Sequence, residues 1–246
     1  MPQGVDVSHW TPVRDWDAFV GSGATFFGAK ACEGTAVVDP TFAAHRDGFR
    51  EHCAEFTMAV WYTMFHCKKD PVSQAELLAD TVGELGPRER LCLDFEETSY
   101  SAVEPAVLKR FGLGYLEAFF ARLDSLGALG GTRGIVYTGI RHWQVLGDPE
   151  WPRAQQLDLW VARYAKPAPL PPASLPRPWP YWSILQWTDG QTGIVAPVPG
   201  IGVCDRDAIR SLVPFQEQSR QVKGNQPDRH ARFSHNDATT GALLEC

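Results

Sequence analysis

Short apolar segments that suit β-strands alternate with longer amphipathic segments along most of this 246-residue chain. The strand-like segments lie at residues 4–8, 24–31, 56–65, 90–96, 134–138, 157–164 and 181–188. Amphipathic segments that suit helices separate the first five, and the longest of these covers residues 104–126. Such alternation predicts a mostly parallel sheet covered by helices. The continuous apolar character of the strands fits burial on both faces.

The placement of polar residues favours a closed barrel over an open, doubly wound sheet. They recur at the C-terminal ends of the predicted strands, at Asp6, Lys30, Tyr62, Asp94, Glu96, Tyr137 and Gln186. In a barrel, those ends converge on one face, where active sites lie. The first strand continues as DVSHWT, which lacks the glycines of a dinucleotide-binding turn. Helical segments shorten after Gly147, so we expect an irregular, TIM-like (β/α) barrel with reduced helices in its second half.

The domain organisation follows from two shifts in composition. Residues 165–180 are rich in proline, and we interpret them as a stiff surface loop because a strand follows at once. After Pro214 the sequence becomes polar and charged, with little to bury. We therefore expect one barrel domain over residues 1–213 and a flexible polar tail over residues 214–246.

Charge and hydropathy argue against several classes of partner. The net charge of −6 disfavours nucleic acid, which normally requires a basic face. No run of 18 apolar residues exists, so we expect no membrane insertion. The first ten residues, MPQGVDVSHW, lack a basic region followed by an apolar stretch. The sequence thus predicts a protein made in the cytoplasm without a visible signal peptide.

The cysteine and histidine patterns indicate neither a metal nor a cofactor. Six cysteines occur without a C-x-x-C pair, and we interpret Cys32, Cys92 and Cys204 as reduced core residues. Seven histidines show no spacing typical of metal ligands, and no G-x-S-x-G elbow is present. Cys67 follows His66 directly, but neighbouring side chains on a strand point apart, which disfavours a cysteine peptidase.

The strongest local signal for chemistry is the sequence LDFE at residues 93–96. Because side chains alternate along a strand, Asp94 and Glu96 should point to the same side. Two carboxyl groups held together favour one protonated and one ionised member, which is what glycosidic cleavage requires. Taken alone, this short motif also fits two solvated acids at a strand end, paired with Arg90 or Arg163.

Two further acids are expected beside this pair. Asp6 lies in the first predicted strand, where a carboxylate is costly unless it is paired or functional. Asp205 lies in the sequence GVCDRD near the end of the barrel domain. The first and last strands of a closed barrel are neighbours, so Asp6 and Asp205 should meet. A hydrogen-bonded turn that closes the barrel is the structural alternative for both.

Seven motifs, taken in order over residues 4–210, resemble the family 25 glycoside hydrolases, the Chalaropsis-type lysozymes. They are GVDVSHW, AKACEGTAVVDPTF, LDFEE, GIVYTGIRHW, LWVARY, ILQWTDG and GVCDRDAI. The resemblance implies a flattened, incomplete barrel that cleaves the β-1,4 bond between N-acetylmuramic acid and N-acetylglucosamine in peptidoglycan. It implies Glu96 as general acid, Asp94 as its catalytic partner, and Asp6 and Asp205 as the remaining family acids.

The resemblance also implies residues that bind the glycan strand. Side chains expected to line the groove by stacking and hydrogen bonding are Tyr62, Tyr137, Trp160 and Gln186. Lys30 either neutralises part of the acidic ring or pairs with Glu33, and we favour the ion pair. The chain departs from the family pattern at Thr11, where glutamine is usual, and at residues 63–64, where a histidine is more common.

The stereochemical route stays open at this point. Inversion through water, a covalent intermediate and attack by the substrate's own acetamido group all use a carboxyl pair, and we favour the last. Alternatives to a muramidase are a non-catalytic peptidoglycan-binding protein and a glycosidase acting on another N-acetylated polysaccharide such as chitin. We expect a monomer that reaches the wall after lysis or by a separate export route, as a phage endolysin would.

Overall fold

The computed structural model describes residues 3–164, 174–190 and 196–210. Its strands are β1 (Gln3–Val7), β2 (Phe26–Glu33), β3 (Val37–Val38), β4 (Met58–Met64), β5 (Glu89–Phe95), β6 (Gly134–Thr138), β7 (Leu157–Ala162), β8 (Ile184–Thr188) and β9 (Asp205–Ile209). Its helices are α1 (Trp16–Gly21), α2 (Phe42–His52), α3 (Pro71–Val82), α4 (Glu97–Tyr100), α5 (Pro105–Ser125), α6 (Ile140–Gln144) and the 3-10 helix η1 (Pro152–Gln156).

The strands form a closed barrel, as the sequence predicts. Their order is β1-β9-β8-β7-β6-β5-β4-β2, and a parallel pairing of β1 with β2 closes the ring. The strands run parallel except β9, which is antiparallel to both β1 and β8. The short β3 lies outside the ring as an antiparallel addition to β2. The sequence pattern predicts neither β3 nor β9 as a strand.

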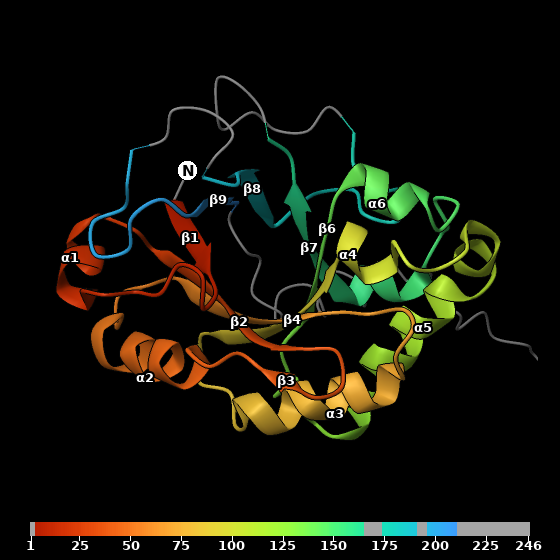
Figure 1. Ribbon diagram of the computed structural model, residues 1–246, viewed down its shortest axis with the longest axis horizontal. Coiled ribbons are helices and arrows are strands. Elements are labelled where there is room, and N and C mark those ends of the chain that lie inside the picture. The colour runs from red at the N-terminus through yellow and green to blue at the C-terminus, as the bar shows by residue number, and fades with distance from the viewer. Residues whose placement is uncertain (1–2, 165–173, 191–195, 211–246) are drawn as a thin grey trace, which may run out of the picture. The chain divides into compact units, whose positions relative to one another are not determined.

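Helices cover only part of the barrel. Figure 1 shows α2, α3 and α5 along one side, while the strands β7, β8 and β9 lie away from them. In the described part of the chain after residue 147, the only helix is the five-residue η1. The expected loss of helices in the second half of the barrel is therefore confirmed. Residues 165–173 of the expected proline-rich loop and the expected tail at 214–246 lie outside the described residues.

Local sequence explains where α3 begins and ends and which face of α5 is buried. Asp70 caps α3 by accepting a hydrogen bond from the Ser73 amide, Pro71 fills the first turn, and Gly83 ends the helix with φ of 69°. Helix α5 buries one stripe of apolar residues, among them Leu108, Leu116, Phe119, Phe120 and Leu123. These caps and stripes fix the helices against the outer face of the strands.

The barrel has two apolar cores. A large one lies between the strands and the helices, and a smaller one fills the barrel itself. The inner core contains Phe26, Met58, Val60, Cys92, Ile135, Tyr137, Trp160, Ile184 and Ile209. Five cysteines are free and buried, namely Cys32, Cys53, Cys67, Cys92 and Cys204. No helix in the described part of the chain is long and apolar enough to cross a membrane.

Candidate active site

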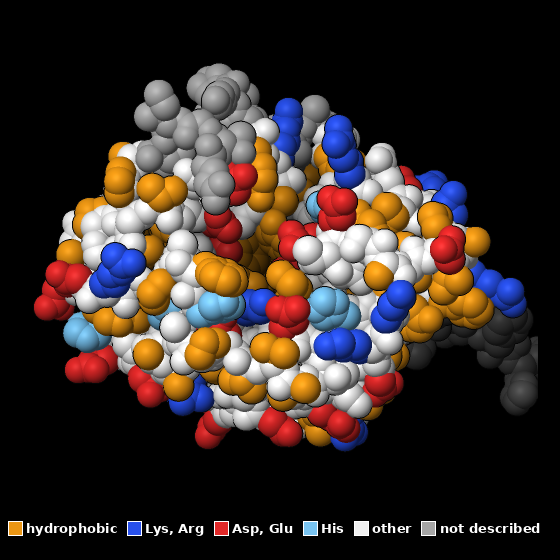
Figure 2. Space-filling model, viewed as in Figure 1, with side chains coloured by type: hydrophobic (Ala, Val, Ile, Leu, Met, Phe, Trp, Pro, Cys, Tyr) orange, Lys and Arg blue, Asp and Glu red, His pale blue; other side chains and the backbone are white. Residues whose placement is uncertain are grey.

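A pocket of about 190 Å³ opens above the inner core, at the C-terminal ends of the parallel strands. Figure 2 shows this face hollowed, with acidic side chains at the border of the hollow and apolar atoms inside it. The pocket is lined by Asp6, Ser8, Trp10, Lys30, Tyr62, Met64, Asp94, Glu96, Tyr137, Trp160, Tyr164, Gln186 and Asp205. All nine residues that the sequence analysis selects are among them.

The four expected carboxyl groups meet in this pocket although they come from distant parts of the chain. Asp6 on β1 stands opposite Asp205 in the antiparallel register of β1 and β9. Asp94 is the last residue but one of β5, and Glu96 follows two residues later as the N-cap of α4. The barrel closure therefore brings the motifs GVDVSHW, LDFEE and GVCDRDAI together.

Glu96 is held by the first turn of α4. As the N-cap of this helix, its side chain accepts the Ser99 amide hydrogen, while the Ser99 hydroxyl accepts the Glu96 amide hydrogen. The Thr98 hydroxyl donates to Glu96 Oε1 over 3.1 Å. Glu96 is partly exposed at the pocket wall, so its carboxyl group is both fixed and reachable.

Asp94 has the opposite environment. It is 6% exposed, and its Oδ1 has no hydrogen-bond partner among the described residues. Burial, followed by the nearby charges of Glu96 and Asp6, raises the pKa of Asp94 well above its ordinary value. Asp94 consequently favours its protonated form.

Gln186 organises the other side of the pocket. Its Nε2 donates to Asp6 Oδ2 over 2.9 Å and to Asp205 Oδ2 over 3.3 Å. Its Oε1 accepts hydrogen bonds from the hydroxyls of Tyr137, at 2.7 Å, and Tyr164, at 2.9 Å. With both amide ends occupied, Gln186 positions carboxyl and phenol groups. Gln186 also lines the pocket, as the sequence predicts, and a direct contact with the sugar stays a prediction.

The three expected aromatic residues lie at different depths. Trp160 is 1% exposed and forms the floor, edge-to-face with Tyr137 at a centroid distance of 5.3 Å. Tyr62 is partly exposed and donates its hydroxyl hydrogen to the Val7 carbonyl over 3.1 Å. Gly28 makes room for the floor, since a Cβ there would stand 2.9 Å from the Trp160 ring. Trp160 and Tyr137 therefore shape the site more than they cover its surface.

A fifth carboxyl group, Asp207, lies behind the pocket and is absent from the sequence-based selection. It is fully buried, and Trp160 Nε1 donates to its Oδ1 over 2.9 Å. Burial and the charge of Asp205 raise the pKa of Asp207 well above its ordinary value. Its Oδ2 makes no hydrogen bond to a described residue when both carboxyl groups are treated as acceptors. A hydrogen bond between Asp6 and Asp207, which raises the pKa of Asp6 and lowers that of Asp207, requires a proton on one of the two carboxyl groups.

The pKa values of Asp6 and Asp205, on the same side of the pocket, are raised for the same reasons. Burial, and next the charge of Asp207, raise the pKa of Asp6 well above its ordinary value. Burial and the charge of Asp6 raise the pKa of Asp205 to about 8. Strand alternation offered a signal for Asp207, since it follows Asp205 by two residues in CDRD and must face the same side.

Lys30 pairs with Glu33, as favoured by the sequence analysis. Its Nζ lies 2.5 Å from Glu33 Oε2, and His66 Nε2 lies 3.0 Å from Glu33 Oε1. Burial opposes ionisation of Glu33, but hydrogen bonds from Lys30 and His66 outweigh it and lower the pKa of this carboxyl group. The charge of Lys30 also lowers the pKa of Asp94, though less than burial raises it. Lys30 and Glu33 thus form an ion pair at the edge of the pocket.

The hollow continues past Glu96 into a second pocket, which shares Tyr137 and Tyr164 with the first. Its other side is formed by Gly139, Ile140, Arg141, His142 and Ala162. His142 Nδ1 lies 2.8 Å from the Tyr100 hydroxyl, which ties this wall to α4. The two pockets together form a groove, and Glu96 lies where they meet.

The chemistry open to this groove is acid–base chemistry. Among the described residues, no three histidine, cysteine or acidic side chains are arranged to hold a metal ion. A partly exposed carboxyl group next to a buried one with raised pKa can donate a proton and stabilise a developing cation. Side chains that the sequence analysis does not select but that line the first pocket are Ser8, Trp10, Met64 and Tyr164.

The chain is similar to known proteins in both sequence and fold. Residues 5–194 match the family model described as glycosyl hydrolases family 25. A curated relative, lysozyme M1 of Streptomyces globisporus, is 26% identical over 206 residues. That match covers 80% of this chain, which spans only 65% of the length of the relative.

Solved structures show the same fold at lower identity. The bacterial lysozyme from Streptomyces coelicolor is 24% identical, with a TM-score of 0.71 over 85% of this chain and 92% of that chain. The muramidase from Trichobolus zukalii is 23% identical, with a TM-score of 0.68 over 92% of this chain and 100% of that chain. At these identities the likeness concerns the fold of the barrel.

Proposed function

The chain belongs to family 25 of the glycosyl hydrolases, and from this premise we propose that it is a peptidoglycan hydrolase that cleaves the β-1,4 bond between N-acetylmuramic acid and N-acetylglucosamine. The observation that carries the proposal is the carboxyl pair at the end of β5. Asp94 is buried with a raised pKa, and Glu96 is fixed and partly exposed in the same pocket. Glycoside cleavage needs such a pair.

In this proposal the pair enters the reaction with one proton, which lies on Asp94 while the pocket is empty. An N-acetylated sugar bound above it donates its acetamido N–H to Asp94, and this hydrogen bond favours the Asp94 carboxylate. The sugar also displaces water from Glu96 and so favours its protonated form. Substrate binding therefore moves the proton to Glu96, the group that can reach the glycosidic oxygen.

Glu96 then protonates the leaving oxygen as the C1–O bond breaks. The acetamido oxygen of the substrate attacks C1, and Asp94 stabilises the positive charge on the resulting ring. The Glu96 carboxylate next accepts a proton from water, whose oxygen bonds to C1 and opens that ring. The pair regains its proton, and the product keeps the β configuration. Asp6 and Asp205 hold the other wall through Gln186.

The decisive experiment is mass spectrometry of products from purified peptidoglycan, comparing the wild type with Glu96→Gln. Glu97→Gln is the matched control, because Glu97 is exposed and lines neither pocket. We expect the wild type to release fragments with a reducing N-acetylmuramic acid end. The rate of their release should fall by about 10²- to 10⁴-fold in Glu96→Gln and stay unchanged in the control.

Other outcomes would redirect the proposal. Binding without products would identify a catalytically silent wall-binding protein. Cleavage of chitin with no action on peptidoglycan would keep the acid pair and change the substrate. An α-anomer as the first product would exclude the acetamido route in favour of inversion.

A further inference from the structure

Trp10 is the most exposed large apolar side chain in the described part of the chain, at 81%. It lies in the turn that follows β1, where the Thr11 amide donates to the Ser8 carbonyl over 3.0 Å. Single exposed apolar residues are common and need no explanation. Trp10, however, lines the pocket that holds Asp6, Asp94 and Asp205. A large flat ring is therefore held at the edge of a carboxyl-rich hollow.

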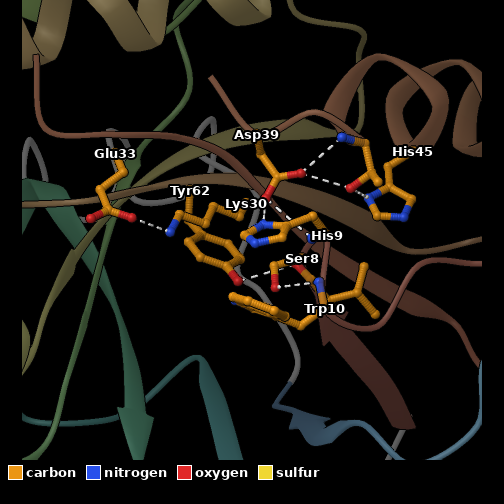
Figure 3. A network of polar contacts seen from close by, with 10 residues as sticks. Ser8, His9, Trp10, Lys30, Glu33, Asp39, His45 and Tyr62 are labelled. Carbon is orange, nitrogen blue, oxygen red and sulfur yellow. Dashed lines mark hydrogen bonds and ion pairs between the residues drawn. The ribbon is translucent and has the colours of Figure 1, made fainter. Parts of the chain in front are cut away.

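The turn that carries Trp10 is anchored by a buried carboxylate. Asp39 Oδ2 accepts hydrogen bonds from the His9 amide, at 3.1 Å, and from His9 Nδ1, at 2.8 Å. Its Oδ1 accepts from the amide and the hydroxyl of Thr41, at 2.9 and 2.7 Å. Figure 3 shows this network behind the turn. Asp39 is 3% exposed, so the anchor is part of the folded core.

The anchor extends to the indole ring through His9. The imidazole of His9 packs against Trp10 with ring centroids 4.4 Å apart and an interplanar angle of 41°. Since Asp39 fixes the imidazole, the indole has a rigid support on one side and solvent on the other. In Figure 3 the ring extends from the turn toward Tyr62, which lines the same pocket. An exposed ring supported in this way is prepared to stack.

The groups around the indole ring define which kind of ligand can stack on it. Pocket residues near this end include Ser8, Asp6 and Asp205, which accept or exchange hydrogen bonds with hydroxyl groups. Burial and nearby negative charge already raise the pKa values of Asp6 and Asp205, so the additional negative charge of an anionic ligand would be unfavourable here. A pyranose has an apolar ring face for the indole and hydroxyl edges for the carboxyl groups. The chemistry of this end therefore fits a neutral sugar.

We infer that Trp10 is the stacking platform of a sugar subsite, which binds a neutral N-acetylated pyranose of the glycan strand next to the bond that is cleaved. This inference rests on the proposed function, because it assigns one ring of the same substrate. His9 and Asp39 are positioning residues that act through Trp10. The subsite contributes affinity and leaves the chemical step to Glu96 and Asp94.

The test measures binding separately from cleavage. In the Glu96→Gln background, calorimetry gives the Kd of a peptidoglycan tetrasaccharide of alternating N-acetylglucosamine and N-acetylmuramic acid. We expect Trp10→Ala to raise this Kd by about tenfold, an effect typical of losing one aromatic contact. Trp10→Phe, which keeps a ring, should raise it by about threefold or less.

Controls separate stacking from folding. Phe111→Ala removes another exposed aromatic ring, 45% exposed on α5 and outside both pockets, and should leave the Kd unchanged. The thermal midpoint of Trp10→Ala should match that of the parent because the indole is exposed. As a second readout, bound tetrasaccharide should protect the tryptophan fluorescence from acrylamide quenching in the parent, and much less in Trp10→Phe.

The two proposals fail in different ways. A wild-type protein that neither binds nor cleaves peptidoglycan would overturn the proposed function. Normal cleavage with the same Kd in the parent and in Trp10→Ala would overturn the subsite alone. A lower kcat in Trp10→Ala with unchanged Kd would also overturn it, because stacking at a separate ring changes binding rather than the chemical step.

Discussion

Strand β5 buries one carboxyl group near each of its ends, and the two have opposite surroundings. At the N-terminal end, Glu89 is 2% exposed and accepts hydrogen bonds from Arg50, at 2.7 and 2.8 Å, and from Trp61 Nε1, at 3.0 Å. Burial opposes ionisation of Glu89, but these donors outweigh it and lower its pKa. At the C-terminal end, Asp94 is 6% exposed with a raised pKa and an Oδ1 without a partner among the described residues.

The contrast shows that burial alone does not decide what a carboxyl group does. Both acids lie on one strand and are buried to a similar extent, but they differ in the number of hydrogen-bond donors around them. Glu89 is fully satisfied by the fold and supports stability. Asp94 is left unsatisfied and faces a pocket, so that the partner missing from the fold can be supplied by a ligand. This division follows the two ends of a barrel, one for stability and one for chemistry.

The strongest test of the contrast is Asp94→Asn. We expect kcat on peptidoglycan to fall by about 10²- to 10³-fold, because asparagine cannot accept the acetamido N–H as a carboxylate does. The free energy of unfolding should stay equal or rise, because an unsatisfied buried acid is removed. Turnover assays and urea denaturation measure the two effects, with Asp80→Asn on the exposed face of α3 as control. Turnover within threefold of the wild type would refute the role of Asp94.

Glu89→Gln should produce the reverse pattern. The substitution leaves the Arg50 guanidinium without its carboxylate, which should cost about 2–3 kcal/mol of unfolding free energy and lower Tm by roughly 4–12 °C. The kcat of the folded fraction should stay close to that of the wild type, because Glu89 lies at the far end of β5. If Glu89→Gln lost turnover without losing stability, the division between the two ends of β5 would be wrong.

The pH dependence of stability sharpens the comparison. The pKa of Asp205 is about 8 in the folded protein, whereas an unfolded aspartate titrates near 3.9. The folded state therefore holds the Asp205 proton more tightly, and this stabilisation is complete below pH ~4 and lost as the pH rises through 8. Asp205→Asn should consequently be neutral at pH 4 and more stable than the wild type by about 1 kcal/mol at pH 8. Urea denaturation at both pH values would detect this, and an equal gain at both would contradict it.

The smallest effect is expected for Asp207→Asn. If Asp207 shares a proton with Asp6, an asparagine amide can replace it and still accept the Trp160 indole hydrogen. Unfolding free energy should change by less than about 0.5 kcal/mol and turnover by less than about threefold. Asp207→Leu, which removes the acceptor, should cost about 2 kcal/mol. A large loss of turnover in Asp207→Asn would show that the ionised form is required.

The sequence predicts the parallel part of the barrel well, because its strands are apolar, uniform and separated by helices. Strand β9 is beyond this kind of reasoning, since DRDAI begins with three charged residues and resembles a surface turn. Its two aspartates point inward because β9 lies between β1 and β8, which only the closed ring reveals. The meeting of Asp6 and Asp205 was predictable from closure, and the burial of Asp207 was not.

Side-chain partners were less predictable than the position of the site. The sequence predicts Gln186 and Trp160 as lining residues, which they are, but it does not predict the hydrogen bonds that the Gln186 amide and the Trp160 indole nitrogen make to other side chains. The partners of Glu89 lie 39 and 28 residues away, at Arg50 and Trp61, and no local pattern connects them. Sequence patterns fix which face a residue points to, and packing decides which neighbour it meets.

The pairing of β1 with β9 determines when the pocket can assemble during folding. The contact from Gln186 to Asp6 spans 180 residues of chain, and β1 finds its second neighbour only in residues 205–209. Contacts so distant in sequence form slowly and late in folding. During synthesis on the ribosome, β1 cannot pair with β9 until almost the whole barrel has been made, so this wall of the pocket assembles last. A nascent or partly folded chain therefore lacks this wall of the pocket, and the pairing of β1 with β9 is the step that completes it.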